Sequence, residues 1–156
     1  MIITGGVAPS FEGRLEQDAP YIGQPGEQAW HRAIVETTQQ SQTLMCMQLL
    51  HAGRYARVPE CVAPSALKAT INKFTPKALT TSEVWSTIET YVDAASRARD
   101  FGYHAVEIMG SEGYLINQFT SQVTNVREDE FGGSFENRCR FALETVRRIK
   151  AVARQL

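Results

Sequence analysis

The strongest constraint on the fold is the alternation of short apolar runs with amphipathic segments. Leu44–Leu50 and Ala105–Met109 are apolar runs of strand length, and each follows a segment with helical periodicity. Continuous apolar runs are typical of parallel strands that are buried on both faces. Strands that alternate with helices predict parallel βαβ units with right-handed crossovers. The sequence therefore predicts an α/β fold with a parallel sheet.

Two helices are predicted before and between these runs. The first covers residues 27–42 and places Trp30 and Ile34 on its apolar face. The second begins at Thr80–Glu83, whose spacing matches a capping box, and ends at Gly102. A glycine suits this C-terminal position because it adopts positive φ without steric cost.

The remaining segments are predicted as loops, one short strand and a final helix. Residues 1–3 predict a strand that ends in a glycine turn at Thr4–Gly6. Residues 51–79 and 110–133 show no clear periodicity, and ordered loops of such length in compact domains are usually functional. Ser134 is expected to cap the last helix. The side chains expected on the buried face of that helix are Phe135, Cys139, Ala142, Val146, Ile149 and Val152.

Composition excludes several functional classes. Sixteen Lys and Arg residues face seventeen Asp and Glu residues, so no basic surplus indicates a nucleic-acid partner. No apolar stretch approaches the roughly 18 residues of a membrane span, and the N-terminus lacks signal-peptide features. The three cysteines have no CxxC spacing, so neither a disulfide framework nor a zinc site is indicated. We expect a soluble, cytoplasmic protein without a membrane partner or a metal.

Periodicity leaves two architectures open, a doubly wound open sheet and part of a (β/α) barrel. No GxGxxG or GxxxxGK[ST] motif follows a strand, which weighs against the nucleotide-binding open sheets. In both architectures the functional groups gather at the C-terminal ends of the strands. Three segments meet this condition: Thr4–Gly6, Gln48 with His51–Tyr55, and Met109–Phe119.

The first two of these segments offer contacts to a ligand. At Thr4–Gly6 the glycines either let a flat ligand approach the backbone or serve a turn with positive φ. Gln48 interrupts an apolar run, where an unsatisfied carboxamide costs roughly 1–3 kcal/mol. A heterocycle with alternating donors and acceptors would satisfy this amide, and so would the backbone or a neighbouring side chain. His51 is a candidate ligand or acid, with a structural role as the alternative.

The third segment carries a candidate proton donor. Glycines on both sides of Ser111–Glu112 bend the chain, and Glu112 and Tyr114 are spaced to line the mouth of a pocket. A phenol donates a proton as a weak acid, since its ordinary pKa is about 10. The alternative is a tyrosine that packs on its apolar body with its hydroxyl in water. These residues indicate a polar, aromatic site without naming a reaction.

An ordered series of motifs resembles the signature of the old yellow enzyme family, which consists of FMN-dependent (β/α)₈-barrel oxidoreductases. The residues that carry the resemblance are Gln48–Arg54, Val62–Leu67, Gly113–Phe119, Asn125, Arg127, Asp129–Ser134, Glu136–Arg138, Arg140–Phe141 and Glu144. The resemblance implies an α/β fold that is a partial TIM (β/α)₈ barrel, with parallel strands two to four and their helices. A complete barrel takes about 250 residues, so residues 1–156 are expected to form a single incomplete barrel domain. Its open sheet edges favour self-association.

One detail indicates a subgroup within this family. Met109–Tyr114 is similar to the corresponding segment of the NADPH-dependent 2,4-dienoyl-CoA reductases, as are Thr4–Pro9 and residues 51–74. Typical ene-reductases have a histidine pair, or histidine and asparagine, at the positions of Met109 and Glu112. Enteric members of the subgroup have an arginine that contacts CoA at the position of Val123, and valine does not supply that charge.

The resemblance also implies a role for each candidate residue. Gly6 would lie beside the flavin, Gln48 would hydrogen-bond its pyrimidine ring, Tyr114 would donate a proton, and Glu112 would orient or tune Tyr114. The implied reaction reduces a conjugated C=C bond of an enoyl or dienoyl thioester, with FMN as cofactor and NADPH as electron donor. FAD and a 4Fe–4S cluster belong to a part of full-length relatives that lies outside this chain.

Four alternatives to dienoyl-CoA reduction follow from the same residues. A general ene-reductase or a related amine dehydrogenase keeps the flavin and changes the substrate. An inactive truncated barrel keeps the ancestry and loses the activity. A non-flavin enzyme would use Glu112 and Tyr114 as an acid–base pair.

Overall fold

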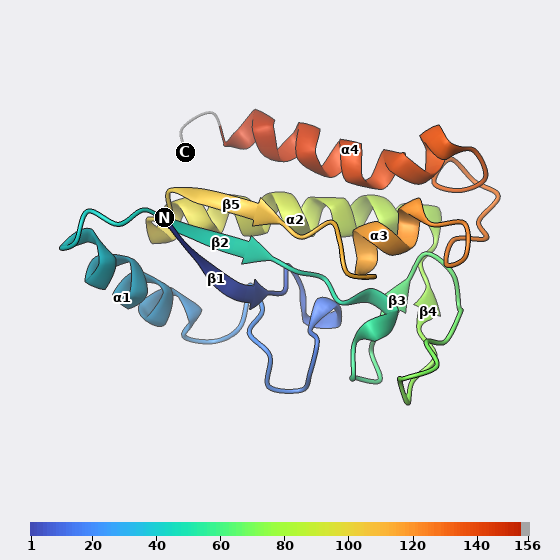
Figure 1. Cartoon of the computed structure of the whole chain (residues 1–156), viewed down its shortest axis with the longest axis horizontal. Helices are drawn as coiled ribbons and strands as arrows, with labels where there is room; N and C mark the ends of the chain where they lie inside the picture. The colour runs from blue at the N-terminus through green and yellow to red at the C-terminus, as the bar shows by residue number, and fades with distance from the viewer. Residues whose placement is uncertain (154–156) are drawn as a thin grey trace.

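A three-stranded parallel sheet forms the centre of the structure, a computed structural model that describes residues 1–153 (Figure 1). The strand order is β1 (Ile2–Val7), β2 (Met45–Leu49) and β5 (Ala105–Ile108). The three longest helices are α1 (Glu27–Gln39), α2 (Thr81–Phe101) and α4 (Phe135–Val152). Helix α1 connects β1 to β2 and helix α2 connects β2 to β5, which confirms the predicted α/β fold with parallel strands.

Short elements occupy the segments that follow the strands. They are the 3₁₀ turns η1 (Phe11–Gly13) and η2 (Gly53–Tyr55), the two-residue strands β3 (Val62–Ala63) and β4 (Lys77–Ala78), and helix α3 (Leu115–Thr120). The prediction of loops at 51–79 and 110–133 was therefore incomplete. The expected glycine turn at Thr4–Gly6 is wrong, because β1 continues through these residues and Gly6 pairs with Gln48.

The core lies between one face of the sheet and the helices. Met45, Met47 and Leu49 of β2 are buried in it together with Ile88 and Tyr91 of α2. Val106 and Ile108 of β5 pack against the same cluster. Side chains alternate along a strand, so the residues between them point to the opposite face. Within residues 1–153 no helix covers that face, which we call the open face (Figure 1).

Helix α2 follows the prediction at both ends. The Thr80 hydroxyl accepts a hydrogen bond from the Glu83 N–H at 3.2 Å, and the Glu83 carboxylate accepts one from the Thr80 N–H at 2.8 Å. Gly102 ends the helix with φ of 97°. The capping box and the glycine C-cap are both confirmed.

The predicted buried face of α1 is wrong. Ile34 is exposed, whereas His31 and Val35 are buried. The His31 ring stacks on Trp30 and on Phe101, with ring centroids 3.6 and 4.9 Å apart. Burial lowers the pKa of His31 to about 4, so the ring is neutral and packs as an aromatic side chain. Apolar periodicity does not reveal such a residue.

The predicted buried face of α4 is confirmed at Ile149 and wrong at Phe135, Val146 and Val152, which are exposed. Cys139 and Ala142 are half-buried, and the other buried side chains are Arg138, Phe141 and Thr145. The Phe141 ring stacks on Phe119 with centroids 4.3 Å apart. The Arg138 guanidinium donates to the carbonyl oxygens of Thr120 and Gly133, which satisfies a charged group on the buried side.

Candidate functional site

Two of the predicted site residues, Gly6 and Gln48, form a row across the sheet together with Glu107. The strand register aligns Gly6 of β1 with Gln48 of β2, and Gln48 with Glu107 of β5. Gln48 Nε2 donates to Glu107 Oε1 at 2.7 Å, and the Gln48 N–H donates to the Thr4 hydroxyl at 3.0 Å. The row therefore presents an amide and a carboxylate side by side on the open face.

Glu107 is a site residue that the sequence analysis missed. Its signal was an acidic side chain in the apolar run Ala105–Met109, as unusual there as Gln48 is in Leu44–Leu50. Glu107 is half-buried. Burial raises the pKa of the Cys46 thiol, and the negative charge of Glu107 raises it further. Gln48 thus has a side-chain partner within the protein, which was the structural alternative for this residue.

Packing against Leu50 also explains why residue 6 is a glycine. A Cβ atom at Gly6 would lie 2.8 Å from Cβ of Leu50, closer than real contacts allow. Neither Gly5 nor Gly6 has positive φ, so the turn alternative does not apply. The missing side chain keeps Leu50 in place and leaves the Gly6 end of the row without side-chain bulk.

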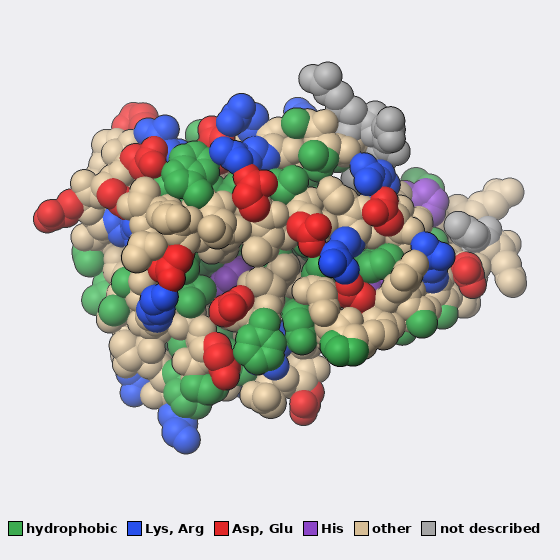
Figure 2. Space-filling view, turned by 180° about the vertical axis from the view of Figure 1, so that it is seen from behind, with side chains coloured by type: hydrophobic (Ala, Val, Ile, Leu, Met, Phe, Trp, Pro, Cys, Tyr) green, Lys and Arg blue, Asp and Glu red, His purple; other side chains and the backbone are tan. Residues whose placement is uncertain are grey.

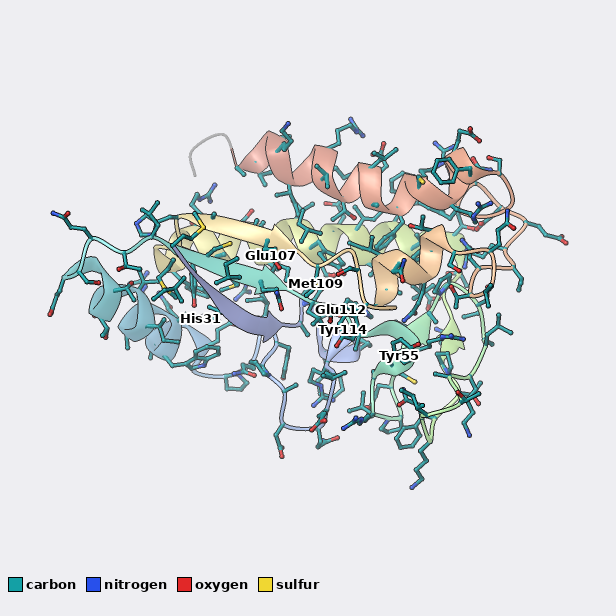
Figure 3. The ribbon with its side chains drawn as sticks, in the orientation of Figure 1. His31, Tyr55, Glu107, Met109, Glu112 and Tyr114 are labelled. Atoms are coloured by element: carbon teal, nitrogen blue, oxygen red, sulfur yellow. The ribbon has the colours of Figure 1, made fainter. Side chains whose placement is uncertain are left out.

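Glu112 and Tyr114 meet at a cavity beyond the C-terminal ends of β2 and β5. The cavity has a volume of about 360 Å³ and is lined by Leu15, Tyr55, Arg57, Ile71, Asn72, Glu112 and Tyr114. Figure 3 shows Glu112, Tyr114 and Tyr55 close together in this region, with Glu107 and Met109 preceding them on and just after β5. Gly6 and Gln48 do not line this cavity. The predicted site residues therefore form two groups, Gly6 and Gln48 in the row and Glu112 and Tyr114 at the cavity.

Two aromatic rings at the cavity are arranged edge to face. Tyr55 and Tyr114 are both half-buried, with ring centroids 6.4 Å apart and ring planes at 87°. Tyr55 lies at the end of a candidate segment, but the sequence analysis assigned it no role of its own, since it stands in a stretch without periodicity. No hydrogen bond joins Glu112 to Tyr114 among residues 1–153. Glu112 is exposed and has φ of 61°, a left-handed conformation that costs a non-glycine residue energy.

His51 is not part of this cavity. Its Nδ1 accepts a hydrogen bond from the Gly53 N–H at 3.1 Å, and burial lowers its pKa to about 3. The ring borders a different hollow of about 350 Å³, together with Glu12, Glu60 and Lys77 among others. Figure 2 shows histidine and acidic side chains around a hollow on the rear face. The contacts support the structural role for His51.

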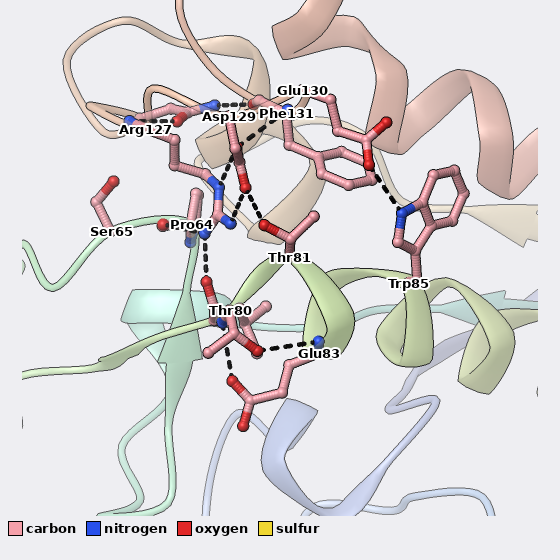
Figure 4. Close-up of polar contacts among 12 residues, drawn as sticks. Pro64, Ser65, Thr80, Thr81, Glu83, Trp85, Arg127, Asp129, Glu130 and Phe131 are labelled. Atoms are coloured by element: carbon pink, nitrogen blue, oxygen red, sulfur yellow. Dashed lines mark hydrogen bonds and ion pairs between the residues drawn. The ribbon is translucent and has the colours of Figure 1, made fainter.

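A polar network fastens the segment after α3 to the rest of the molecule (Figure 4). Arg127 donates to the carbonyl oxygens of Pro64 and Leu79 and pairs with Asp129, which also accepts from the Thr81 hydroxyl at 2.6 Å. The Arg127 hydrogen bonds hold the pKa of Asp129 at about 2, below its usual range. Pro64, Arg127 and Asp129 belong to the motifs that carry the family resemblance, whereas Leu79 and Thr81 do not. The network lies outside the Tyr114 cavity.

Metal and membrane features are absent from the described residues. Residues 1–153 contain no group of three or more His, Cys, Asp or Glu side chains arranged to hold a metal ion. None of the helices in that range has the length and apolar character needed to cross a bilayer.

Comparison with known proteins identifies the family. Residues 1–155 match the model of the NADH:flavin oxidoreductase / NADH oxidase family. The chain belongs to this family. Its relatives include an NADPH dehydrogenase of Geobacillus sp. (strain WCH70), which is 35% identical over 153 residues, 97% of this chain and 45% of that protein. The NADPH dehydrogenase of Clostridium acetobutylicum is 43% identical over 121 residues, 76% of this chain and 36% of that protein.

Solved structures agree with this assignment. Morphinone reductase superposes with a TM-score of 0.91 at 32% identity, covering 96% of this chain and 46% of that chain. A morphinone reductase structure in complex with tetrahydroNAD matches equally well. A 2-naphthoyl-CoA reductase complex, at 24% identity and a TM-score of 0.89, shows the fold alone. The expected old yellow enzyme family, its partial barrel fold and its cofactors FMN and NADPH are confirmed, and the chain spans about half or less of the relatives' length.

Proposed function

We propose that this chain supplies part of the flavin and substrate site of an FMN-dependent oxidoreductase that reduces a conjugated C=C bond with electrons from NADPH. The row formed by Gly6, Gln48 and Glu107 carries this proposal, because it places hydrogen-bonding groups on the open face in register. The family match supports the same cofactor.

The row fits the polar edge of a flavin. The pyrimidine ring of FMN alternates donors and acceptors, and the pair of Gln48 and Glu107 offers both. Gly6 adds no side chain beside them. When bound, FMN supplies the hydride that reduces one end of a conjugated system. Gln48 and Glu107 would bind and orient it, while the helices behind the sheet keep water from the other face.

Tyr114 is the proposed proton donor. Its ring stands beyond the end of β5 at a cavity of about 360 Å³, and its phenol would deliver a proton to the other end of the conjugated system. Glu112 is assigned a supporting role at the cavity mouth, where it is exposed and makes no hydrogen bond to Tyr114 within residues 1–153. Its left-handed backbone directs the turn that leads into Tyr114.

The substrate class we propose is a 2,4-dienoyl-CoA thioester. Support comes from Met109 and Glu112, which stand where typical ene-reductases have a histidine pair, or histidine and asparagine. Val123 is exposed and uncharged, so the CoA portion would have to find its cationic contacts elsewhere. A general ene-reductase is the second candidate, favoured by the NADPH dehydrogenases among the relatives.

We also infer that residues 1–156 form one incomplete barrel domain. The sheet ends at β1 on one side and at β5 on the other, and both edges are unpaired among the described residues. Open edges favour pairing with a further chain segment or a second copy. An inactive partial barrel is the alternative that this arrangement keeps open.

Flavin binding tests the proposal directly. The purified chain is titrated with FMN, and binding is followed by flavin fluorescence and by co-elution of the visible absorption band. Gln48→Ala is expected to weaken FMN binding about tenfold, the effect of losing roughly 1.4 kcal/mol. Gln122→Ala, an exposed amide outside the site, is the matched control. Equal affinity of both variants, or no retained flavin in any of them, would contradict the proposal.

The half-reactions test the roles of the substrate residues. In the flavin-loaded protein, Tyr114→Phe should slow flavin reoxidation by 2,4-hexadienoyl-CoA by about a hundredfold and leave reduction by NADPH unchanged. Equal losses in both half-reactions would refute the proton-donor role. Faster turnover of a simple enone than of the thioester would favour the general ene-reductase. Turnover by colourless protein would favour the non-flavin alternative.

A further inference from the structure

One buried amide joins the two segments that carry the aromatic rings of the cavity. Gln118 of α3 is 1% exposed. Its Oε1 accepts from the Arg54 N–H at 3.0 Å, and its Nε2 donates to the carbonyl oxygens of Ala52 and Gly113 at 3.2 and 2.7 Å. Ala52 and Arg54 follow β2, and Gly113 follows β5. The side chain therefore connects the ends of two neighbouring strands.

The surrounding backbone leaves no space for a different arrangement. A Cβ atom at Gly53 would lie 2.2 Å from Gln118 Oε1, and one at Gly113 would lie 2.4 Å from the Tyr55 ring. Both glycines have positive φ, 60° and 80°. The turn at Gly53, the Gln118 amide and the bend at Gly113 thus fit together only with glycine at both positions.

Gln118 also acts close to the proposed proton donor. Tyr114 directly follows Gly113, and Tyr55 follows Arg54, so each ring is attached next to a backbone group that Gln118 holds. The Gln118 N–H donates to the Tyr114 carbonyl oxygen at 2.8 Å. Displacement of either segment would change how the two rings face each other.

We propose that Gln118 is a positioning residue, which fixes Tyr114 opposite Tyr55 by holding the backbone of both segments. The proposal rests on the role of Tyr114 proposed above. Gln118 does not line the cavity, so it acts through Gly113 and Arg54 without touching the substrate.

Asn125 provides the matched control for a purely stabilising role. It is buried, and its Nδ2 donates to the carbonyl oxygens of Phe119 and Phe131, both at 2.7 Å. These bonds hold the other end of α3, away from Tyr114. A residue that only stabilises the fold should behave alike at either position, whereas a positioning residue should not.

Fluorine NMR separates the two roles without any flavin. 3-Fluorotyrosine is placed at position 114 of the chain, which is then combined with Gln118→Met or with Asn125→Leu. Both substitutions keep the volume of the side chain and remove its hydrogen bonds. We expect Gln118→Met to shift and broaden the resonance. The increase in its relaxation rate caused by a soluble paramagnetic agent should be at least twice as large as in the parent chain. Asn125→Leu should leave the resonance unchanged at a similar loss of unfolding temperature.

Gln118→Glu keeps the test valid if the methionine variant does not fold. A carboxylate still accepts from the Arg54 N–H and donates to neither Gly113 nor Ala52. Because the Arg54 bond still holds the Tyr55 segment, we expect the resonance of fluorotyrosine at position 55 to shift less than that of fluorotyrosine at position 114. Shifts of equal size at both positions would overturn the proposal, as would no shift at position 114.

The flavin-loaded protein supplies the functional measurement. Gln118→Glu should slow the reoxidation of the flavin by 2,4-hexadienoyl-CoA on the order of tenfold, with NADPH reduction unchanged. If the parent protein does not bind flavin, the proposed function is refuted, and the NMR result alone decides the positioning role. A normal reoxidation rate together with a shifted Tyr114 resonance would overturn the link between position and catalysis.

Discussion

The helical side of the sheet and its open face are built on different principles. On the helical side, Phe119 and Phe141 stack in a closed apolar core, and even Arg138 has its hydrogen bonds satisfied within the protein. On the open face, Gln48 and Glu107 have each other as partners and remain half-exposed. The difference teaches that the groups that stabilise the fold and the groups that we propose to bind the ligand lie on separate faces, so substitutions should affect one of these properties at a time.

The largest effect is expected from the aromatic core. Phe119→Ala removes a fully buried ring and should lower the free energy of unfolding by about 4 kcal/mol. Phe135→Ala removes an exposed ring from α4 and should change it by less than about 0.5 kcal/mol. Urea denaturation followed by circular dichroism measures both values. Similar losses for the two variants would mean that the helical side is not the stabilising layer.

The polar network on the helical side should show the next largest effect. Arg127→Met leaves the Asp129 carboxylate and two carbonyl oxygens without their partner, at a cost of about 3 kcal/mol. Arg147→Met breaks an exposed ion pair with Glu144 and should cost less than about 1 kcal/mol. A cost at Arg127 no greater than at Arg147 would show that the network does not fasten the segment after α3.

The sequence predicted the helical side better in outline than in detail. The apolar runs were sufficient to predict the parallel sheet, and the capping box and Gly102 placed both ends of α2. The buried faces of α1 and α4 were predicted only in part, because His31 and Arg138 are buried with internal partners and periodicity counts only apolar residues. Helix α3 has six residues, too few for a periodic signal.

The open face was predictable where a polar residue interrupts an apolar run. Gln48 stood out for this reason, and Glu107 carried the same signal without being recognised. Tyr55 and Gln118 were not predictable, because their importance depends on contacts between segments about 60 residues apart. The roles of Gly6, Gln48, Glu112 and Tyr114 remain predictions that the titration and the half-reactions test.

Acidification should weaken the helical side through His31. Burial lowers its pKa to about 4 from the ordinary value of 6.5, so the unfolded chain binds a proton more readily than the folded one. Stability is therefore fully present above pH 6.5 and is lost as the pH falls toward 4. Between pH 7 and pH 5 this amounts to about 2 kcal/mol.

The pH dependence is checked by urea denaturation at the two pH values. His31→Phe should lose about 2 kcal/mol less than the parent chain between pH 7 and pH 5. A parent-like pH dependence in His31→Phe would show that burial does not lower the pKa of His31 in the folded protein.

The smallest effect is expected at the cavity mouth, where a substitution should stabilise. Glu112 has φ of 61°, and glycine adopts this conformation without the steric cost of a Cβ atom. Glu112→Gly should raise the free energy of unfolding by about 1 kcal/mol, whereas Glu112→Ala keeps the Cβ atom and should not. Equal stability of both variants would place the effect in the side chain. A gain in Glu112→Gly with slower reoxidation of the flavin would show that the cavity mouth trades stability for activity.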